Sequence, residues 1–243
     1  MNRFCLGDVH GGYRALTQVL QSSGIDYNKD LLICLGDTCD SWPDTPLCFE
    51  ELLKIKNLVY IIGNHDSWTQ QYLKFGLTPQ IWTSQGGRAT LNAYINLLQN
   101  GEEEQLQRHL VLLESGVYYH ELDNMLFVHG GFNWHHPIAG QSPYDLMWDR
   151  DLITVAGYWQ GRIDKGVADD TERVQDYDEV FIGHTPTSRI APDLKPVKLS
   201  NVWCLDQGAG WEYGKLTLMN IDTYEYFQSD IVSTLYPGEH GRK

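Results

Sequence analysis

Short apolar runs that end at glycine recur along this chain and alternate with longer stretches whose apolar residues recur every three or four positions. The runs cover 4–6, 31–35, 59–62, 125–128 and 180–182. Runs of this length bounded by glycine are typical of buried strands. The alternation therefore predicts strand–helix–strand units in which successive strands lie parallel to one another.

Helical spacing of apolar residues marks the stretches between these runs. It predicts helices over 13–22, 45–56, 91–98 and 106–113. The second half of the chain is richer in strand patterns, which predict a meander built from 117–122, 125–128, 202–205, 216–221 and 224–227.

Together these elements predict an α/β fold, a two-sheet β-sandwich flanked by helices. A chain of 243 residues without a long Pro, Gly or Ser linker is of a size that commonly forms one domain. We therefore expect a single domain over 1–243, with a helical insertion at about 67–115.

Acidic, amide and imidazole residues follow five of the predicted strands. The segments that carry them are Gly7-Asp8-Val9-His10-Gly11, Gly36-Asp37-Thr38-Cys39-Asp40, Gly63-Asn64-His65-Asp66, His129-Gly130-Gly131 and Gly183-His184-Thr185-Pro186. Asp8, Asp37 and Asn64 follow one another at intervals of roughly 30 residues, about the length of one strand–helix–strand unit. Open α/β sheets place ligand sites at the carboxyl ends of their strands, so these side chains should converge. The sequence thus predicts a metal-dependent hydrolase.

The series GDVHGG, GDTCD, GNHD, HGG and GHTP, in that order, resembles the metallophosphoesterase (calcineurin-like) superfamily. Within it, the chain is most similar to the bacterial and phage branch of the phosphoprotein phosphatases, and the similarity extends from residue 4 to about residue 220. This resemblance implies a phosphoesterase that hydrolyses phosphomonoesters, as a bacterial serine/threonine protein phosphatase does.

The resemblance also implies a dinuclear metal site. By the family pattern, Asp8, His10 and Asp37 hold one metal, and Asp37 bridges to a second metal that Asn64, His129 and His184 complete. A mixed set of carboxylate, amide and imidazole ligands suits manganese, iron or zinc better than magnesium, and manganese is favoured here.

Two further residues resemble the family's proton-transfer pair. His65 corresponds to the general acid that protonates the leaving oxygen, and Asp40 to the carboxylate that orients its ring. An imidazole has a pKa suited to this exchange near neutral pH.

One phosphate-binding arginine of the family pattern is missing. Family members carry arginine directly after the orienting aspartate, whereas this chain has Ser41. The segment Trp148-Asp149-Arg150 resembles the one that presents a second arginine, which makes Arg150 a candidate phosphate ligand or, alternatively, a surface ion pair.

Other functions stay open at this point. The missing arginine favours a nucleotide pyrophosphohydrolase of the diadenosine polyphosphatase type, or a phosphodiesterase, and a non-catalytic scaffold is a third alternative.

Tryptophans lie near several of the motifs and would either pack the loops or stack on a substrate ring. They are Trp42, Trp68, Trp134, Trp148 and Trp211.

Charge and cysteine content restrict the partners. A net charge of −14 argues against binding a nucleic-acid polymer, which requires a basic surface. The expected partner is a phosphorylated protein or a small phosphoester. Five cysteines without a CxxC pair predict a reduced, cytoplasmic protein, and no apolar run is long enough to predict membrane insertion or a signal peptide.

Overall fold

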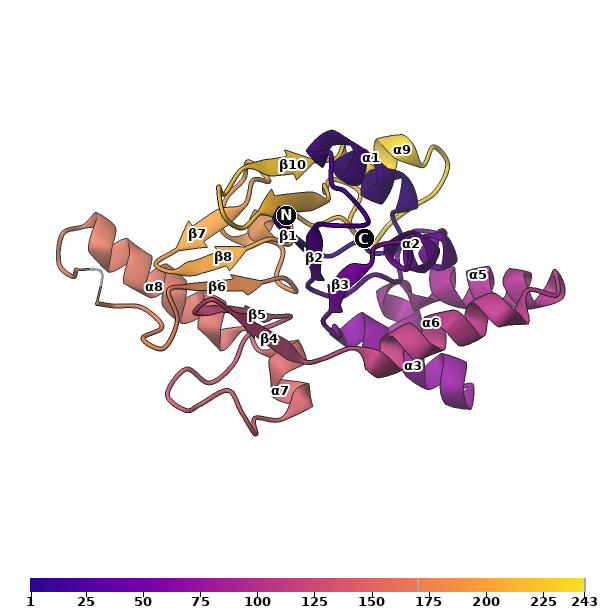
Figure 1. Ribbon diagram of the computed structural model, residues 1–243, viewed down its shortest axis with the longest axis horizontal. Helices are drawn as coiled ribbons and strands as arrows, with labels where there is room; N and C mark the ends of the chain where they lie inside the picture. Colours follow the sequence, from indigo (N-terminus) through magenta and orange to yellow (C-terminus); the bar gives the residue numbers. More distant parts are fainter. Residues whose placement is uncertain (170, 243) are drawn as a thin grey trace.

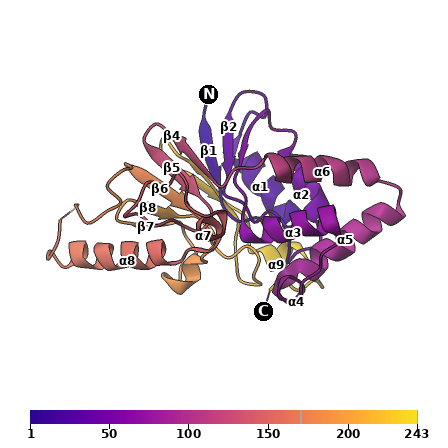
Figure 2. The ribbon, with the colours of Figure 1, turned by 90° about the horizontal axis from the view of Figure 1, so that it is seen from below.

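Two five-stranded sheets pack face to face in the computed structural model, which describes residues 1–169 and 171–242. The expected range 1–243 thus includes two residues, 170 and 243, that lie outside the described part. Helices cover the outer faces of both sheets (Figures 1 and 2). The predicted α/β fold, with two sheets flanked by helices, is confirmed.

The first sheet has the strand order β10-β9-β1-β2-β3. Its strands are β1 (Arg3–Leu6), β2 (Leu31–Cys34), β3 (Asn57–Tyr60), β9 (Thr217–Asn220) and β10 (Tyr226–Gln228). Strands β1, β2 and β3 are parallel neighbours, with Cys5 opposite Ile33 and Ile33 opposite Val59. This is the arrangement that the roughly 30-residue spacing predicts.

The second sheet has the order β4-β5-β6-β8-β7. Its strands are β4 (Tyr119–Leu122), β5 (Met125–Val128), β6 (Glu179–Ile182), β7 (Val197–Leu199) and β8 (Val202–Cys204). Here the predicted meander is wrong, because β5, β6 and β8 are parallel to one another and the last two strands of the chain belong to the first sheet. Parallel neighbours require crossover connections, and the one between β5 and β6 contains two helices, Pro143–Trp148 and Asp151–Asp164.

The helices differ more from the sequence patterns than the strands do. They are α1 (Tyr13–Ser23), α2 (Thr45–Leu52), α3 (Asn64–Phe75), α4 (Gln80–Trp82), α5 (Arg88–Gln99), α6 (Glu103–Ser115), α7 (Pro143–Trp148), α8 (Asp151–Asp164) and α9 (Val232–Leu235), with short helical turns η1 (Thr83–Gly87) and η2 (Thr187–Arg189). Asn64, which follows β3, begins α3, a helix that the sequence patterns did not predict. Helix α8 was not predicted, because its two glycines and β-branched residues weaken the helical pattern. Among the described residues, no helix is both long and apolar enough to cross a bilayer.

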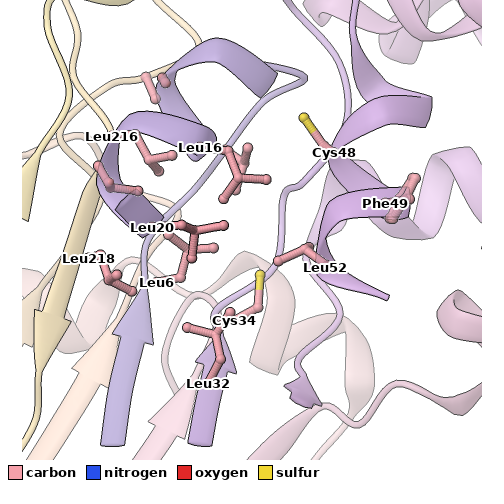
Figure 3. Packing of buried hydrophobic residues seen from close by; sticks show 14 of the residues in the cluster. Leu6, Leu16, Leu20, Leu32, Cys34, Cys48, Phe49, Leu52, Leu216 and Leu218 are labelled. Atoms are coloured by element: carbon pink, nitrogen blue, oxygen red, sulfur yellow. The ribbon is translucent and has the colours of Figure 1, made fainter. Parts of the chain in front are cut away.

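Three apolar layers hold these elements together. The first sheet packs against α1 and α2 through residues such as Leu6, Leu16 and Phe49 (Figure 3). The second sheet packs against α8 through Leu152 and Val180. The layer between the sheets is drawn from both of them and includes Cys5, Ile33, Phe127, Phe181 and Met219.

We expect Phe127→Ala to lower the free energy of unfolding by about 3–5 kcal/mol. Phe127 is fully buried between the sheets, and its ring stacks on Phe181 at a centroid distance of 4.9 Å. Urea denaturation followed by circular dichroism measures the change. Leu98→Ala, at a side chain that is 39% exposed, is the control and should change the value by less than about 1 kcal/mol. Equal losses in the two variants would contradict this account of the inter-sheet layer.

Candidate active site

The six predicted metal ligands meet where strands of the two sheets end. Asp8 and His10 follow β1, Asp37 follows β2, Asn64 begins α3 after β3, His129 follows β5 and His184 follows β6. All six side chains are buried. Two groups have their ligand atoms within 4.8 Å of one another, Asp8 with His10 and Asp37, and Asp37 with His129 and His184. Asp37 is common to both groups.

The imidazole rings are oriented by backbone carbonyls. The Nδ1–H of His10 donates to the carbonyl oxygen of Cys39 at 3.1 Å, and that of His129 donates to the carbonyl oxygen of Leu35 at 2.7 Å. Both rings therefore present Nε2 to the centre, where Oδ2 of Asp37 lies 4.0 Å from His10 and 3.4 Å from His129. Such an orienting bond is typical of metal-binding histidines.

His184 adds a free nitrogen to the same centre. Its Nε2 is buried and has no hydrogen-bond partner within the described parts of the chain. Its backbone N–H donates to the Asp8 carboxylate at 3.1 Å. Because buried polar atoms are nearly always paired, an unpaired imidazole nitrogen beside two carboxylates fits a metal ligand. The residues present therefore fit the metals that the motifs imply.

Electrostatics concentrate negative charge on Asp37. Burial alone would raise the pKa of Asp37, but the rings of His129 and His65 hold it well below its usual range. Burial would lower the pKa of His129, whereas Asp37 raises it to about 10. Burial lowers the pKa of His10 to about 3, so this ring is neutral at pH 7. A metal ligand must be deprotonated, so metal binding displaces the proton that His129 shares with Asp37.

Asp66 fixes the loops that carry Asp37 and Asn64, and the sequence patterns did not identify this role. Its carboxylate accepts from the backbone N–H groups of Asp37 at 2.7 Å, Thr38 at 3.0 Å and Gly63 at 3.0 Å. An acid at the third position of a helix, directly after the motif residues, is a usable signal for such a contact. Burial and the charge of Asp37 raise the pKa of Asp66 to about 6.

His65 and Asp40 form a close pair. Nδ1 of His65 lies 2.6 Å from Oδ2 of Asp40, and the same oxygen accepts from Nε1 of Trp82 at 2.8 Å. The backbone N–H of Asp40 donates to Oγ1 of Thr90 at 2.8 Å. The second ring nitrogen of His65 lies 4.0 Å from Oδ2 of Asp37. The His65 ring is thus held with Nε2 toward the predicted metal site.

Arg150 lies beside the loop that carries His184, at the residue before α8 begins. Its Nη1 donates to Oγ1 of Thr185 at 2.7 Å, next to the predicted ligand His184. Burial and the charges of Arg189 and Arg242 lower the pKa of Arg150. The alternative of an ion pair does not hold, because no carboxylate lies within 4.0 Å of this guanidinium among the residues that the structure describes.

Strained backbone surrounds the predicted ligands. Positive φ angles occur at His10 (52°), Asp37 (49°), Asp40 (77°), Ser41 (70°) and His184 (63°). Non-glycine residues rarely adopt this conformation, and where they do the strain often serves a functional site.

Two motif glycines have a steric role. A Cβ at Gly63 would lie 2.1 Å from an Asp37 carboxylate oxygen, and one at Gly183 would lie 2.2 Å from an Asp8 carboxylate oxygen. Only glycine therefore allows the neighbouring strand ends to approach both carboxylates.

The tryptophans near the motifs divide between packing and the site. Trp42 is fully buried and donates to the carbonyl oxygen of Ala209 at 2.7 Å, so it packs a loop. Trp68 meets His65 edge to face at 5.1 Å, and Trp148 meets His184 in the same way at 5.7 Å. Trp134 packs on Trp159, and the ring of Trp211 lies under the guanidinium of Arg242.

The chain is similar to known proteins. Residues 1–226 match the family described as Calcineurin-like phosphoesterase. The serine/threonine-protein phosphatase 1 of Salmonella typhimurium is 26% identical over 225 residues, which cover 89% of this chain and 90% of that protein. The symmetrical bis(5'-nucleosyl)-tetraphosphatase of Coxiella burnetii is 28% identical over 130 residues, which cover 54% of this chain and 42% of that protein.

A solved structure agrees with the fold. A protein serine/threonine phosphatase from Saccharomyces cerevisiae has a TM-score of 0.60 at 12% identity, covering 100% of this chain and 83% of that one.

The match to the tetraphosphatase spans less than half of that relative's length. The family match covers most of the chain, so the protein belongs to the calcineurin-like phosphoesterase family, and the predicted membership of this superfamily is confirmed.

We expect Asp37→Asn to reduce bound metal from about two ions per chain to less than one, because a carboxylate that bridges two ions contributes to both spheres. Elemental analysis of protein dialysed against manganese measures the content. Asp193→Asn, at an exposed position, is the control and should keep the wild-type value. Full metal content in Asp37→Asn would exclude the bridging role.

Proposed function

We propose that this protein hydrolyses phosphomonoesters with two metal ions held on either side of Asp37. The observation that carries this proposal is one buried carboxylate shared by two ligand groups, with the oriented ring of His65 4.0 Å away. The similarity to a serine/threonine-protein phosphatase over 89% of the chain supports a monoester substrate.

The predicted ligands fall into two sets. Asp8, His10 and Asp37 would hold one ion, and Asn64, His129 and His184 would complete the second around Asp37. Bound metals supply an activated water and neutralise charge on the phosphoryl oxygens. Manganese is the favoured ion, with iron or zinc as alternatives, because the set mixes oxygen and nitrogen donors.

His65 acts as the general acid in this scheme. Asp40 accepts from Nδ1 and its negative charge favours a ring that is also protonated on Nε2. This imidazolium passes its Nε2 proton to the leaving oxygen and becomes neutral. The contacts that hold Asp40 come from Trp82 and Thr90. We therefore infer that the helical segment 67–115 is an insertion within a single domain and that it positions the general acid.

Arg150 binds the phosphate in this scheme. Its guanidinium is half-buried and has no carboxylate partner within the described residues. A planar guanidinium can bind two phosphate oxygens at once, which Ser41 cannot do.

A nucleotide pyrophosphohydrolase is the second candidate. It is favoured by the serine at position 41 and by the similarity to a bis(5'-nucleosyl)-tetraphosphatase over 54% of the chain. A scaffold without activity fits less well, because all six predicted ligand residues are present.

A metal-supplemented activity screen tests the proposal. We expect turnover of p-nitrophenyl phosphate and of a phosphoserine peptide, with slower turnover of bis-p-nitrophenyl phosphate, and dinucleoside polyphosphates test the second candidate. No turnover of any of these substrates in protein that contains two metals per chain would refute a phosphoesterase function.

We expect His65→Asn to retain metal while turnover of an alkyl phosphate falls by about 10² to 10⁴, the usual contribution of general acid catalysis. Hydrolysis of p-nitrophenyl phosphate should fall less, because p-nitrophenolate leaves without a proton. The measurement is kcat for both substrates together with metal content. Asn retains a polar side chain but cannot donate from a ring nitrogen, and equal losses on both substrates would contradict the role.

A further inference from the structure

A pocket of about 860 Å³ opens beside the predicted catalytic centre. Ser41, which directly follows Asp40, lines one side of it, and Arg150 lines another. Gly210 packs between Ser41 and the centre, since a Cβ there would lie 2.7 Å from Cδ2 of His10 and 3.0 Å from Oγ of Ser41. The pocket adjoins the centre at Ser41 and at Arg150, the proposed ligand of the reacting phosphate.

Four arginines line this pocket, although the chain has a net charge of −14. They are Arg88, Arg150, Arg189 and Arg242. Within residues 1–169 and 171–242, none of the four has a carboxylate within 4.0 Å, in contrast to Arg3, Arg108 and Arg162, which are all paired. Glu239 is the one acid among the described lining residues. Unpaired guanidiniums gathered in one pocket are suited to an anion.

Arg242 is held in place at the edge of the pocket. Its backbone N–H donates to the carbonyl oxygen of Gly210 at 2.8 Å, and its guanidinium lies 5.2 Å from the ring centroid of Trp211. Its Nη2 donates to Oε1 of Gln85 at 3.0 Å. This bond places Arg242 beside η1, the short helical turn that carries Gln85. A side chain fixed in this way loses little further entropy when it binds a ligand.

Ser41 gives an independent indication of a ligand. Its side chain is 7% exposed, and its Oγ has no hydrogen-bond partner in the described chain. The backbone around it is fixed, since its N–H donates to the carbonyl oxygen of Gly86 at 3.1 Å. A buried hydroxyl without a partner is costly unless a ligand or water completes its bonding.

We propose that this pocket is a second anion subsite, in which Arg88, Arg189 and Arg242 bind a further phosphate group of a small substrate whose reacting phosphate lies at Arg150. The inference rests on the proposed function and specifies its substrate class, a small phosphomonoester that carries at least one further phosphate group. A hollow of about 860 Å³ has the size of a small-molecule site.

Binding of two probes that resist hydrolysis tests the subsite directly. The probes are bis(methylene)triphosphate, which has three linked phosphoryl groups, and methylphosphonate, which has one. Isothermal titration calorimetry on the metal-loaded protein gives Kd for each. We expect Arg242→Gln and Arg88→Gln to weaken the triphosphate analogue by about tenfold to a hundredfold, as for loss of one charge-assisted bond, and methylphosphonate by a much smaller factor.

Arg108→Gln is the matched control. It removes the same charge from the protein, but Arg108 pairs with Glu50 at 2.8 Å and does not line the pocket. Both Kd values should stay at the wild-type level in this variant. Thermal unfolding and metal content confirm that all three variants are folded and loaded.

Three results would overturn the subsite. The first is an unchanged Kd for the triphosphate analogue in both variants. The second is an equal loss of affinity for both probes, which would indicate that the arginines act only through the overall electrostatic field of the protein. The third is an equal loss for a peptide with two phosphoserines, which would indicate a protein substrate. Because binding is measured without turnover, a protein that fails the activity screen yet shows the expected Kd pattern would refute the proposed function and not the subsite.

Discussion

The buried carboxylate of Asp37 is the constraint around which the rest of the centre is arranged. A charge that is 2% exposed is costly unless surrounding groups compensate it. Here imidazoles lie within 4.0 Å of its Oδ2, and the backbone N–H of His65 donates to its Oδ1 at 2.9 Å. The same compensation brings four loops together at one point. A divalent ion could replace the proton on His129 and would satisfy this charge more completely.

The helices that follow β3 stabilise the loop that carries Asp40. The turn η1 and the start of α5 contact the loop after β2, since Gly86 in η1 bonds to Ser41 and Thr90 in α5 bonds to Asp40. Trp82 from the same segment bonds to the Asp40 carboxylate. A segment without a recognised motif thus positions Asp40 and also lines one part of the arginine-lined pocket. Changes in this segment should alter catalysis or substrate choice without touching a ligand.

Site residues could be predicted from the sequence where the geometry of the backbone alone determines where a side chain lies. Asp8, Asp37 and Asn64 could be placed together, because parallel strands end at the same edge of a sheet. The contacts of Trp82 and Arg242 could not be predicted, because their partners Asp40 and Gln85 are 42 and 157 residues away and no local pattern relates them. The order of the second sheet was missed for the same reason, since a strand's apolar pattern does not name its neighbour.

The contacts that close the centre join distant parts of the chain. The N–H of His184 bonds to Asp8 across 176 residues, and the ring of His129 bonds to Leu35 across 94. Closing such long loops has an entropic cost that is recovered only once the sheets have docked. The first 66 residues already hold four of the six predicted ligands, together with His65 and Asp40. A nascent or partly folded chain therefore contains most of the reactive groups but not the geometry that catalysis needs. The active site forms late in folding, in the step in which the two sheets dock.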